Sequence, residues 1–342
     1  MRMLQKTNLK GLSREALLLF AAEQGLPKYR ADQLIHWIYR KRATEIHCIT
    51  EFSKELRAKL SDVAYISSLR LLKRLTSSDG TEKFLFSLED GETVESVLIP
   101  EKDRLTLCIS SQVGCAMGCR FCLTGKLGLI RNLKADEIVD QVISVGGLAL
   151  PRKITNIVLM GMGEPLANLD EVTEALKRII GFVGIAKRRI TLSTAGLVPK
   201  MALLAERGPE VNLAVSLNAT TDQERDRIMP INKRYPIKSL IDACRRFPLG
   251  PRRKITFEYV LIEGLNDSAE DALRLAKLVR GIRCKINLIP FNPHAGSGLK
   301  RPSEKAVLEF RNILADLNLT VLVRESKGQD ILAACGQLRA EH

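Results

Sequence analysis

Apolar residues recur at helical spacing through the first 65 residues of the chain. Residues 13–20 begin with a serine, a preferred N-cap residue, and continue into an apolar run. Residues 31–39 and 52–60 repeat the spacing of a helix with one buried face. The pattern predicts a small helical N-terminal domain over residues 1–65.

A different pattern follows over residues 66–100. Short apolar runs, which include Phe84, Phe86 and Val94, are separated by the turn signals Ser78-Asp79-Gly80 and Asp90-Gly91. Such spacing is typical of antiparallel strands joined by tight turns. We expect a small antiparallel β unit here, which links the helical domain to the rest of the chain and carries Glu95.

From about residue 103 onward, short apolar strands alternate with amphipathic helices. Expected helices include residues 134–144, 169–180 and 269–278. The expected strands are residues 106–110, 156–160, 190–193, 212–217, 255–261, 285–289 and 320–323. Strands that alternate with helices form parallel sheets, because each parallel crossover needs a helix-sized connection. Residues 101–342 are therefore predicted to form an α/β fold, an open or partial βα barrel, with its chemistry at the carboxyl ends of the strands.

Composition supports a globular protein of the cytoplasm. The chain has 342 residues, of which 45% are hydrophobic, and no apolar run approaches the about 18 residues of a membrane span. Residues 1–10 lack the apolar core of a signal peptide. We expect no membrane partner and eight reduced cysteines, because cytosolic thiols rarely form structural disulfides.

Positive charge is concentrated near the N-terminus. The net charge is +14, and residues 1–75 contain 15 basic but only 7 acidic residues. A solvated surface that aids solubility explains such an excess in part. The asymmetry favours a region that faces a polyanion such as a nucleic acid.

Three closely spaced cysteines follow the first strand of the expected barrel. Cys115, Cys119 and Cys122 form a C-x3-C-x2-C motif. All-thiolate ligation favours zinc or an iron–sulfur cluster, and structural zinc requires a fourth ligand that is not found nearby. Three unrelated loop thiols are a far less frequent outcome at this spacing. The motif predicts a cluster of four irons, one of which lacks a protein ligand.

Other strands of the expected barrel end in polar residues. Residues 161–165 form a Gly-Met-Gly-Glu-Pro turn, and Ser193, Ser216 and Asn292 follow later strands. Taken alone, such residues are helix caps or turn residues as often as ligand-binding groups. Cys335, which follows two alanines, would by itself be interpreted as a small core residue.

The cysteine motif and the 161–165 turn are similar to the signature of the radical S-adenosylmethionine (SAM) superfamily. Together with residues 110–115, 229–232 and 334–338, they resemble the RlmN-type RNA adenine carbon-2 methyltransferases. The segments 29–33 and 37–39 also fit that family. The resemblance extends over essentially the whole chain.

The resemblance implies a 4Fe-4S cluster on Cys115, Cys119 and Cys122, with SAM bound to the open iron. It also implies which residues hold SAM. They are Gly163, Glu164, Ser193, Ser216, Leu217, Asn218 and Asn292. The chain departs from the family at Asn218, where a histidine is usual, so a role of that histidine side chain cannot be carried over.

The resemblance assigns catalytic roles to three further residues. It implies that one SAM methylates the sulfur of Cys335 and that a second SAM is cleaved to a radical that activates this methyl group. Cys108 then releases the product by attacking Cys335, which leaves a transient disulfide. Glu95 or Cys108 removes the ring proton of the adenine.

By the same resemblance, the substrates are RNA. They are an adenosine in the peptidyl-transferase region of 23S rRNA and the adenosine 3′ of the tRNA anticodon. Basic runs at residues 187–189 and 252–254 join the N-terminal region as expected phosphate contacts. A flavodoxin-like or other reductant would supply electrons, and nothing in the sequence points beyond a monomer.

Three alternatives remain open from the sequence. A carbon-8 adenosine methyltransferase of the Cfr type shares all the catalytic residues named above. A cluster-bearing RNA-binding or redox protein would not need Cys108, Cys335 or the 161–165 turn. A radical enzyme that acts on a small molecule would leave the basic N-terminal region unexplained.

Overall fold

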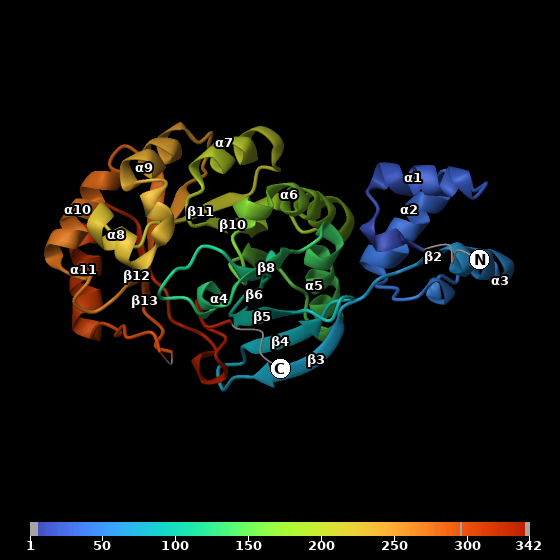
Figure 1. Ribbon diagram of the computed structural model, residues 1–342, viewed down its shortest axis with the longest axis horizontal. Coiled ribbons are helices and arrows are strands. Elements are labelled where there is room, and N and C mark those ends of the chain that lie inside the picture. Colours follow the sequence, from blue (N-terminus) through green and yellow to red (C-terminus); the bar gives the residue numbers. More distant parts are fainter. Residues whose placement is uncertain (1–5, 295, 339–342) are drawn as a thin grey trace.

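A computed structural model describes residues 6–294 and 296–338, so the ends of the expected N-terminal and barrel regions, residues 1–5 and 339–342, lie outside it. The N-terminal region is helical, as predicted, and Figure 1 shows it as a lobe at the right of the main body. Ser13 caps its first helix by accepting the backbone N–H of Ala16. The lobe contains β1 (Thr7–Asn8), α1 (Arg14–Glu23), α2 (Tyr29–Ile35), α3 (Lys54–Val63) and β2 (Ala64–Tyr65).

Buried polar contacts attach this lobe to the main body. The ammonium group of Lys10 lies 2.7 Å from a carboxylate oxygen of Asp140 in α5 (Ala135–Leu148), and both side chains are almost fully buried. Arg178, at the end of α6 (Leu169–Arg178), donates a 2.8 Å hydrogen bond to the carbonyl of Lys10. Such groups are costly to bury unpaired, so these contacts fix how the lobe sits on the two helices.

Within the described residues, ten strands form one mixed sheet, ordered β14-β13-β12-β11-β10-β9-β6-β5-β4-β3. The strands from β6 to β14 run parallel to one another, and β3 to β6 are antiparallel. The sheet contains β3 (Arg70–Thr76), β4 (Glu82–Ser87), β5 (Thr93–Glu101), β6 (Arg104–Cys108), β9 (Asn156–Leu159), β10 (Ile190–Thr194), β11 (Asn212–Ser216), β12 (Ile255–Leu261), β13 (Cys284–Pro290) and β14 (Val321–Val323). All seven strands expected after residue 103 are present, with ends shifted by at most two residues.

The antiparallel strands expected over residues 66–100 also form, but they do not make a separate linker. β5 pairs with β6 along five residues, so β3, β4 and β5 extend the parallel sheet. The expected boundary at residue 100 falls inside β5. The turn signals predicted the positions of these strands correctly. The local sequence does not show that β5 pairs with β6.

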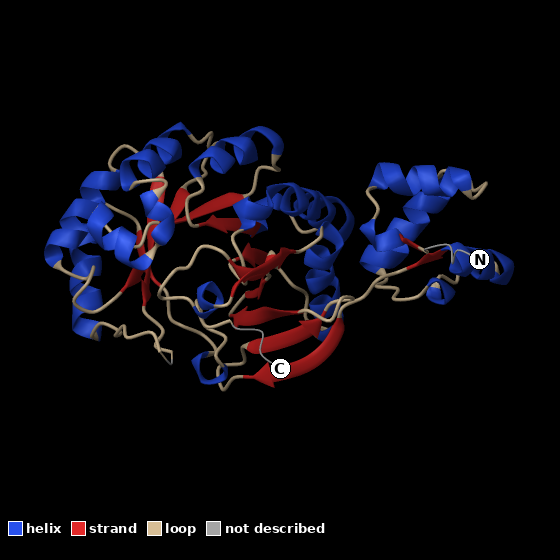
Figure 2. Cartoon of the chain, viewed as in Figure 1, coloured by secondary structure: helices blue, strands red, loops and turns tan. Residues whose placement is uncertain are grey.

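Helices cover one face of the sheet (Figure 2). In β12, Phe257 and Tyr259 point into the main hydrophobic core beneath these helices, whereas Val260 belongs to a smaller apolar cluster on the opposite, inner face. This alternation follows from the two-residue period of a strand. The covering helices are α5, α6, α7 (Val198–Arg207), α9 (Ile237–Arg246), α10 (Ala269–Val279) and α11 (Glu304–Asp316).

The sheet is an open barrel, because β14 and β3 form its two edges and do not pair with each other in the described structure. Two short elements, α4 (Leu123–Lys126) and α8 (Asp222–Ile228), lie near the inner face, and β7 (Gln112–Cys115) pairs with β8 (Gly128–Asn132). Within the described residues, no helix is long and apolar enough to cross a membrane.

Candidate active site

The three predicted cluster ligands line one cavity at the carboxyl ends of the parallel strands. Cys115 ends β7, and Cys119 and Cys122 lie in the loop that leads into α4. No three acidic, histidine or cysteine side chains in the described residues converge closely enough to hold a single metal ion. Structural zinc takes four protein ligands, whereas three thiolates suffice for a cluster with one open iron, so the three cysteines fit a cluster better than structural zinc.

Burial disfavours the thiolate form of two of these cysteines, Cys115 and Cys119. Burial raises the pKa of Cys115 to about 12, and it raises the pKa of Cys119 well above its ordinary value. The neighbouring thiols add to both shifts, which shows that they lie close together. Cluster assembly must therefore release protons from these cysteines.

The turn at residues 161–165 requires its glycines. A Cβ atom on Gly163, where φ is +101°, would lie 2.6 Å from the Cβ of Gln112, and one on Gly161 would lie 2.7 Å from the carbonyl oxygen of Ile109. Glu164 accepts the backbone N–H groups of Leu166 and Ala195 at 3.0 and 2.6 Å. Burial raises the pKa of Glu164 to about 7, although these hydrogen bonds oppose the shift.

Two expected SAM ligands line the cavity, and a third, Asn292, contacts Cys335 without lining the cavity itself. Ser193 and Ser216 line the cavity from β10 and β11. The amide nitrogen of Asn292 donates to the carbonyl of Cys335 at 3.2 Å, while its Oδ1 is buried without a hydrogen-bond partner in the described structure. A buried acceptor without a donor is costly, so Asn292 fits a ligand that brings an N–H group, such as an adenine.

Of the two predicted SAM ligands that follow β11, Asn218 lines the cavity and Leu217 does not. The side chain of Leu217 is fully buried in the main core, its N–H donates to Glu258, and its carbonyl accepts from Arg225. The side chain of Leu217 therefore does not line the cavity, and its assignment to the SAM site stays a prediction from the resemblance. Asn218 does line the cavity, but its Oδ1 accepts the N–H of Val260 at 2.9 Å.

Cys335 stands between the cluster cysteines and Cys108. Two cavities adjoin here, one lined by all three cluster cysteines and the other by Cys108 and Cys122, and Cys335 lines both. Cys335 is exposed to the cavity, although surrounding protein raises its pKa. Burial raises the pKa of Cys108 to about 12, and the Cys335 thiol adds to that shift. The two thiols predicted to act together are thus brought together.

Glu95 lies beside these cavities without lining them. It is buried in β5, two residues from Val97, which pairs directly with Cys108. A carboxylate oxygen of Glu95 lies 3.0 Å from the ammonium group of Lys83 in β4. The structure therefore places the predicted proton acceptor on the sheet face that carries Cys108, paired with the ammonium group of Lys83.

Two charged residues of the site were missed by the sequence analysis. Arg324 follows β14 and lines both cavities, and Glu258 lines the first of them from the middle of β12. Arg324 opposes the rise in the pKa of Cys335 and Cys108. Glu258 accepts a 2.6 Å hydrogen bond from Asn287. Glu258 is a charged residue within an apolar strand, and Arg324 is a cation directly after a strand. These two positions are the signals from which the sequence could have identified them.

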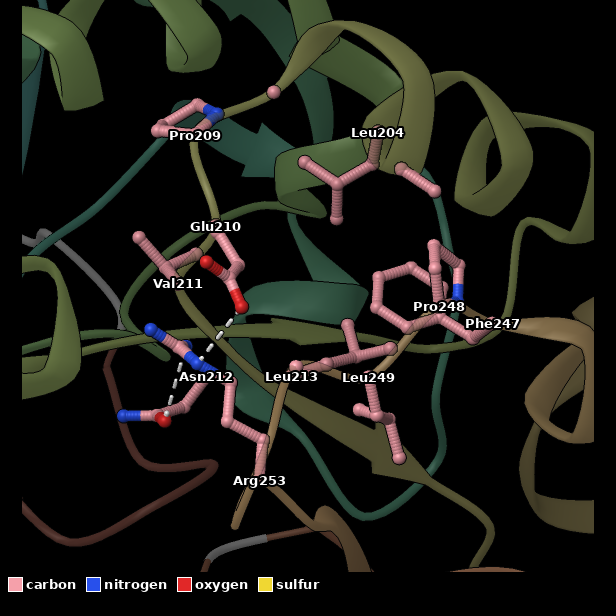
Figure 3. Close-up of a pocket in the computed structure, with 13 residues that line it drawn as sticks. Leu204, Pro209, Glu210, Val211, Asn212, Leu213, Phe247, Pro248, Leu249 and Arg253 are labelled. Carbon is pink, nitrogen blue, oxygen red and sulfur yellow. Dashed lines mark hydrogen bonds and ion pairs between the residues drawn. The ribbon is translucent and has the colours of Figure 1, made fainter.

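The basic runs at residues 187–189 and 252–254 do not border this site. They directly precede β10 and β12, so they lie at the amino edge of the parallel sheet, opposite the cysteines. Figure 3 shows an apolar pocket at that edge, where Glu210 pairs with Arg253 at 3.3 Å. None of the predicted catalytic or cofactor residues lines this pocket.

Two family models match the chain. The Radical SAM superfamily model matches residues 109–276, which include the cysteine motif and the strands from β9 to β12. The model of the ribosomal RNA large subunit methyltransferase N-terminal domain matches residues 7–66, which form the helical lobe. The two models together account for the lobe and most of the barrel.

Whole-length relatives agree with these matches. A dual-specificity RNA methyltransferase RlmN of Pelobacter propionicus is 53% identical over 99% of this chain and 97% of its own. The RlmN of Geobacter sulfurreducens is 54% identical over 98% of this chain and 92% of its own. A radical SAM methyltransferase from Sphaerobacter thermophilus, solved as a crystal structure, superimposes with a TM-score of 0.93 at 45% identity, covering 98% of this chain and 100% of its own. The chain therefore belongs to the RlmN family of radical SAM RNA methyltransferases, which implies a 4Fe-4S cluster and SAM as its cofactors.

Proposed function

We propose that this protein methylates carbon 2 of an adenosine in the peptidyl-transferase region of 23S rRNA and of the adenosine 3′ of the anticodon in tRNA. The placement of Cys335 carries the proposal. A methyl carrier must reach SAM on one side and a resolving thiol on the other, and Cys335 lines both adjoining cavities. A protein that only bound a cluster would need no such thiol.

The residues of the chain divide the work among them. The cluster, when bound, supplies the electron that cleaves SAM reductively, which is chemistry the side chains cannot provide. Cys335 accepts a methyl group from one SAM by displacement and carries this carbon to the adenine ring after a second SAM has been consumed. Gly163, Glu164, Ser193, Ser216, Leu217, Asn218 and Asn292 form the proposed SAM site.

Product release requires Cys108 and a base. Glu95 or Cys108 accepts the proton that leaves the ring carbon. The Cys108 sulfur then attacks the Cys335 sulfur, and the bond between Cys335 and the carbon unit breaks. The carbon keeps the bonding electron pair and takes up a proton to become the methyl group, and the methylated base leaves. This step forms a Cys108–Cys335 disulfide, which an electron donor, flavodoxin-like or other, must reduce before the next turnover.

The adenosine must leave its base stack to reach Cys335, as in other base-modifying enzymes. The edge strand β3 supplies exposed cations, Arg70 and Lys73, and its end contacts the segment that carries Cys335. Phosphate contacts along this edge would orient the RNA without reading its sequence. We place the reaction in the cytoplasm, where both RNAs occur, and we propose a monomer.

Peptide mass spectrometry of the purified, cluster-loaded protein tests the proposed role of Cys335. The peptide that contains Cys335 should carry one methyl group after incubation with SAM, and a single round with RNA and reductant should remove that group. The Cys244 peptide is an internal control, because Cys244 is buried in the outer core. A Cys335 that remains unmethylated under these conditions would rule out the carrier role.

A further inference from the structure

The segment that carries Cys335 connects the two edges of the open sheet. It leaves β14 at one edge and reaches the turn between β3 and β4 at the other edge before it returns to the cluster loop. No strand pairing in the described structure closes the barrel between these edges. Side-chain hydrogen bonds to this turn make the connection instead.

The contacts are reciprocal. The carboxylate of Asp330 accepts the hydroxyl of Ser77 at 2.6 Å and the backbone N–H of Ser78 at 3.1 Å. In the opposite direction, the carboxylate of Asp79 accepts the backbone N–H of Gly328 at 2.9 Å. We call these three hydrogen bonds the clasp. Each joins residues about 250 positions apart in the chain.

A fourth contact connects the same hairpin to the proposed base. The ammonium group of Lys83 donates to the carbonyl of Leu332 at 3.2 Å and lies 3.0 Å from Glu95. Leu332 is only three residues from Cys335. The β3–β4 hairpin thus holds both the Cys335 segment and the carboxylate proposed to act on the same adenine.

The backbone of the segment needs such support. Gly328 and Leu332 adopt left-handed conformations, with φ of +66° and +52°. A Cβ on Gly328 would lie 2.8 Å from the Cβ of Ala333 and 2.9 Å from Cγ2 of Thr81. A leucine disfavours this conformation, so the surrounding contacts must hold Leu332 in place.

We propose that Ser77, Asp79 and Asp330 are positioning residues for Cys335. Through the clasp, they hold the thiol at the point where the two cavities meet, within reach of both the SAM site and Cys108. The proposal rests on the carrier role of Cys335 described above. None of the three residues touches the cavities, so their effect reaches the chemistry only through the Cys335 segment.

Adjacent serines provide a matched test. Ser77→Ala removes the hydroxyl that donates to Asp330, whereas Ser78→Ala keeps its clasp contact, which comes from the backbone. Both are compared with wild type as cluster-loaded protein in a single-turnover methylation of Cys335 at several SAM concentrations. Ser77→Ala should slow this methylation about tenfold or more with the half-saturating SAM concentration unchanged, because misplacement costs rate rather than cofactor binding. Ser78→Ala should behave as wild type.

A second measurement does not depend on activity. The rate of iodoacetamide alkylation at Cys335, resolved by peptide mass spectrometry, should rise several-fold in Ser77→Ala and in the conservative variant Asp330→Asn, and not in Ser78→Ala. The proposed positioning role is wrong if Ser77→Ala leaves the rate of methylation unchanged and both Ser77→Ala and Asp330→Asn leave the rate of alkylation unchanged. If wild-type Cys335 is never methylated, the proposed function fails, and the alkylation rates alone then decide whether the clasp positions the thiol.

Discussion

At the scale of single residues, two thiols that act at different stages of the proposed reaction lie beside the two adjoining cavities. Cys108 is buried on β6, where burial holds its pKa near 12 and keeps it protonated until it acts. Cys335 is exposed to the cavity, and Arg324 beside it opposes the rise in its pKa. The same cation acts on Cys108, and burial raises the pKa of both thiols, so each must lose a proton before it reacts as a thiolate. The two thiols differ in exposure, because Cys335 is exposed and Cys108 is buried.

Replacement of either thiol should stop the reaction at a different stage. Cys108→Ala should accumulate RNA linked covalently to Cys335, because release needs the second sulfur, and Cys335→Ala should give neither adduct nor methylated RNA. Denaturing gel electrophoresis with labelled RNA detects the adduct, with Cys284→Ala, a change far from the cavities, as the control. A Cys108→Ala protein that turns over at the wild-type rate would contradict the two-thiol scheme.

Individual site residues were predictable only where a motif fixed them. The cysteine triplet, the 161–165 turn and Cys335 converge as expected around joined cavities. Leu217, whose side chain is buried in the main core, stays a prediction from the resemblance. Arg324, Glu258 and Lys83 were missed because their importance arises from contacts with distant residues, and a single sequence does not show such contacts.

At the scale of elements, the parallel strands were predictable and the closure of the sheet was not. Periodicity located β9 to β14 because each strand packs one apolar face against helices. The pairing of β5 with β6 and the contact between Asp330 and Ser77 depend on chain segments that meet only in the folded protein. These non-local contacts shape the inner face on which the proposed chemistry takes place.

The clasp should weaken in acid. Although burial raises it, hydrogen bonds from Thr81, Gly328 and Ser77 hold the pKa of Asp79 at about 2, below the ordinary 3.8. At pH values between these two pKa values, Asp79 binds fewer protons in the folded state than in the unfolded state. The stabilisation is full above pH 3.8 and is lost as the pH falls through about 2.

The comparison of wild type with Asp79→Asn measures this effect. Because Asp79 is exposed and solvent screens it, we expect wild type to exceed the variant by at most about 1 kcal/mol in free energy of unfolding at pH 6. The difference should shrink towards zero near pH 2. Urea titrations at several pH values measure this difference in free energy of unfolding. Asp103→Asn, which changes an exposed aspartate, is the control. A difference that is constant with pH would contradict the assigned role of the Asp79 charge.

At the scale of the whole molecule, the N-terminal lobe is fixed to the barrel by buried charge. Lys10→Met would leave Asp140 buried without its cation, and breaking such a pair costs about 3–5 kcal/mol. We therefore expect a loss of that order in the free energy of unfolding measured with urea. Lys6→Met, which changes an exposed lysine, should cost less than about 0.5 kcal/mol. Equal losses in the two variants would argue against the buried pair.

Basic residues on strand β3 and basic residues at the amino ends of the parallel strands should contribute unequally to RNA binding. Reversal of Arg70 and Lys73 on the exposed strand β3 should weaken RNA binding and lower the slope of log affinity against log salt by about one per lost phosphate contact. Reversal of Lys187 and Arg188, at the amino edge away from the cysteines, should have the smaller effect. Fluorescence anisotropy over a salt series measures the affinity and the slope for each variant. A larger effect of reversing Lys187 and Arg188 would indicate that the RNA binds at the amino ends of the parallel strands.

The most direct test of the account is the identity of the methylated nucleoside. RNA from cells that lack this gene, and from cells that re-express wild type or Cys335→Ala, is digested and separated by chromatography before mass spectrometry. Chromatography is essential, because 2-methyladenosine and 8-methyladenosine have the same mass. We predict that 2-methyladenosine disappears from 23S rRNA and tRNA without the gene and returns only with wild type. The appearance of 8-methyladenosine, or no change in either RNA, would contradict the proposed carbon-2 methylation.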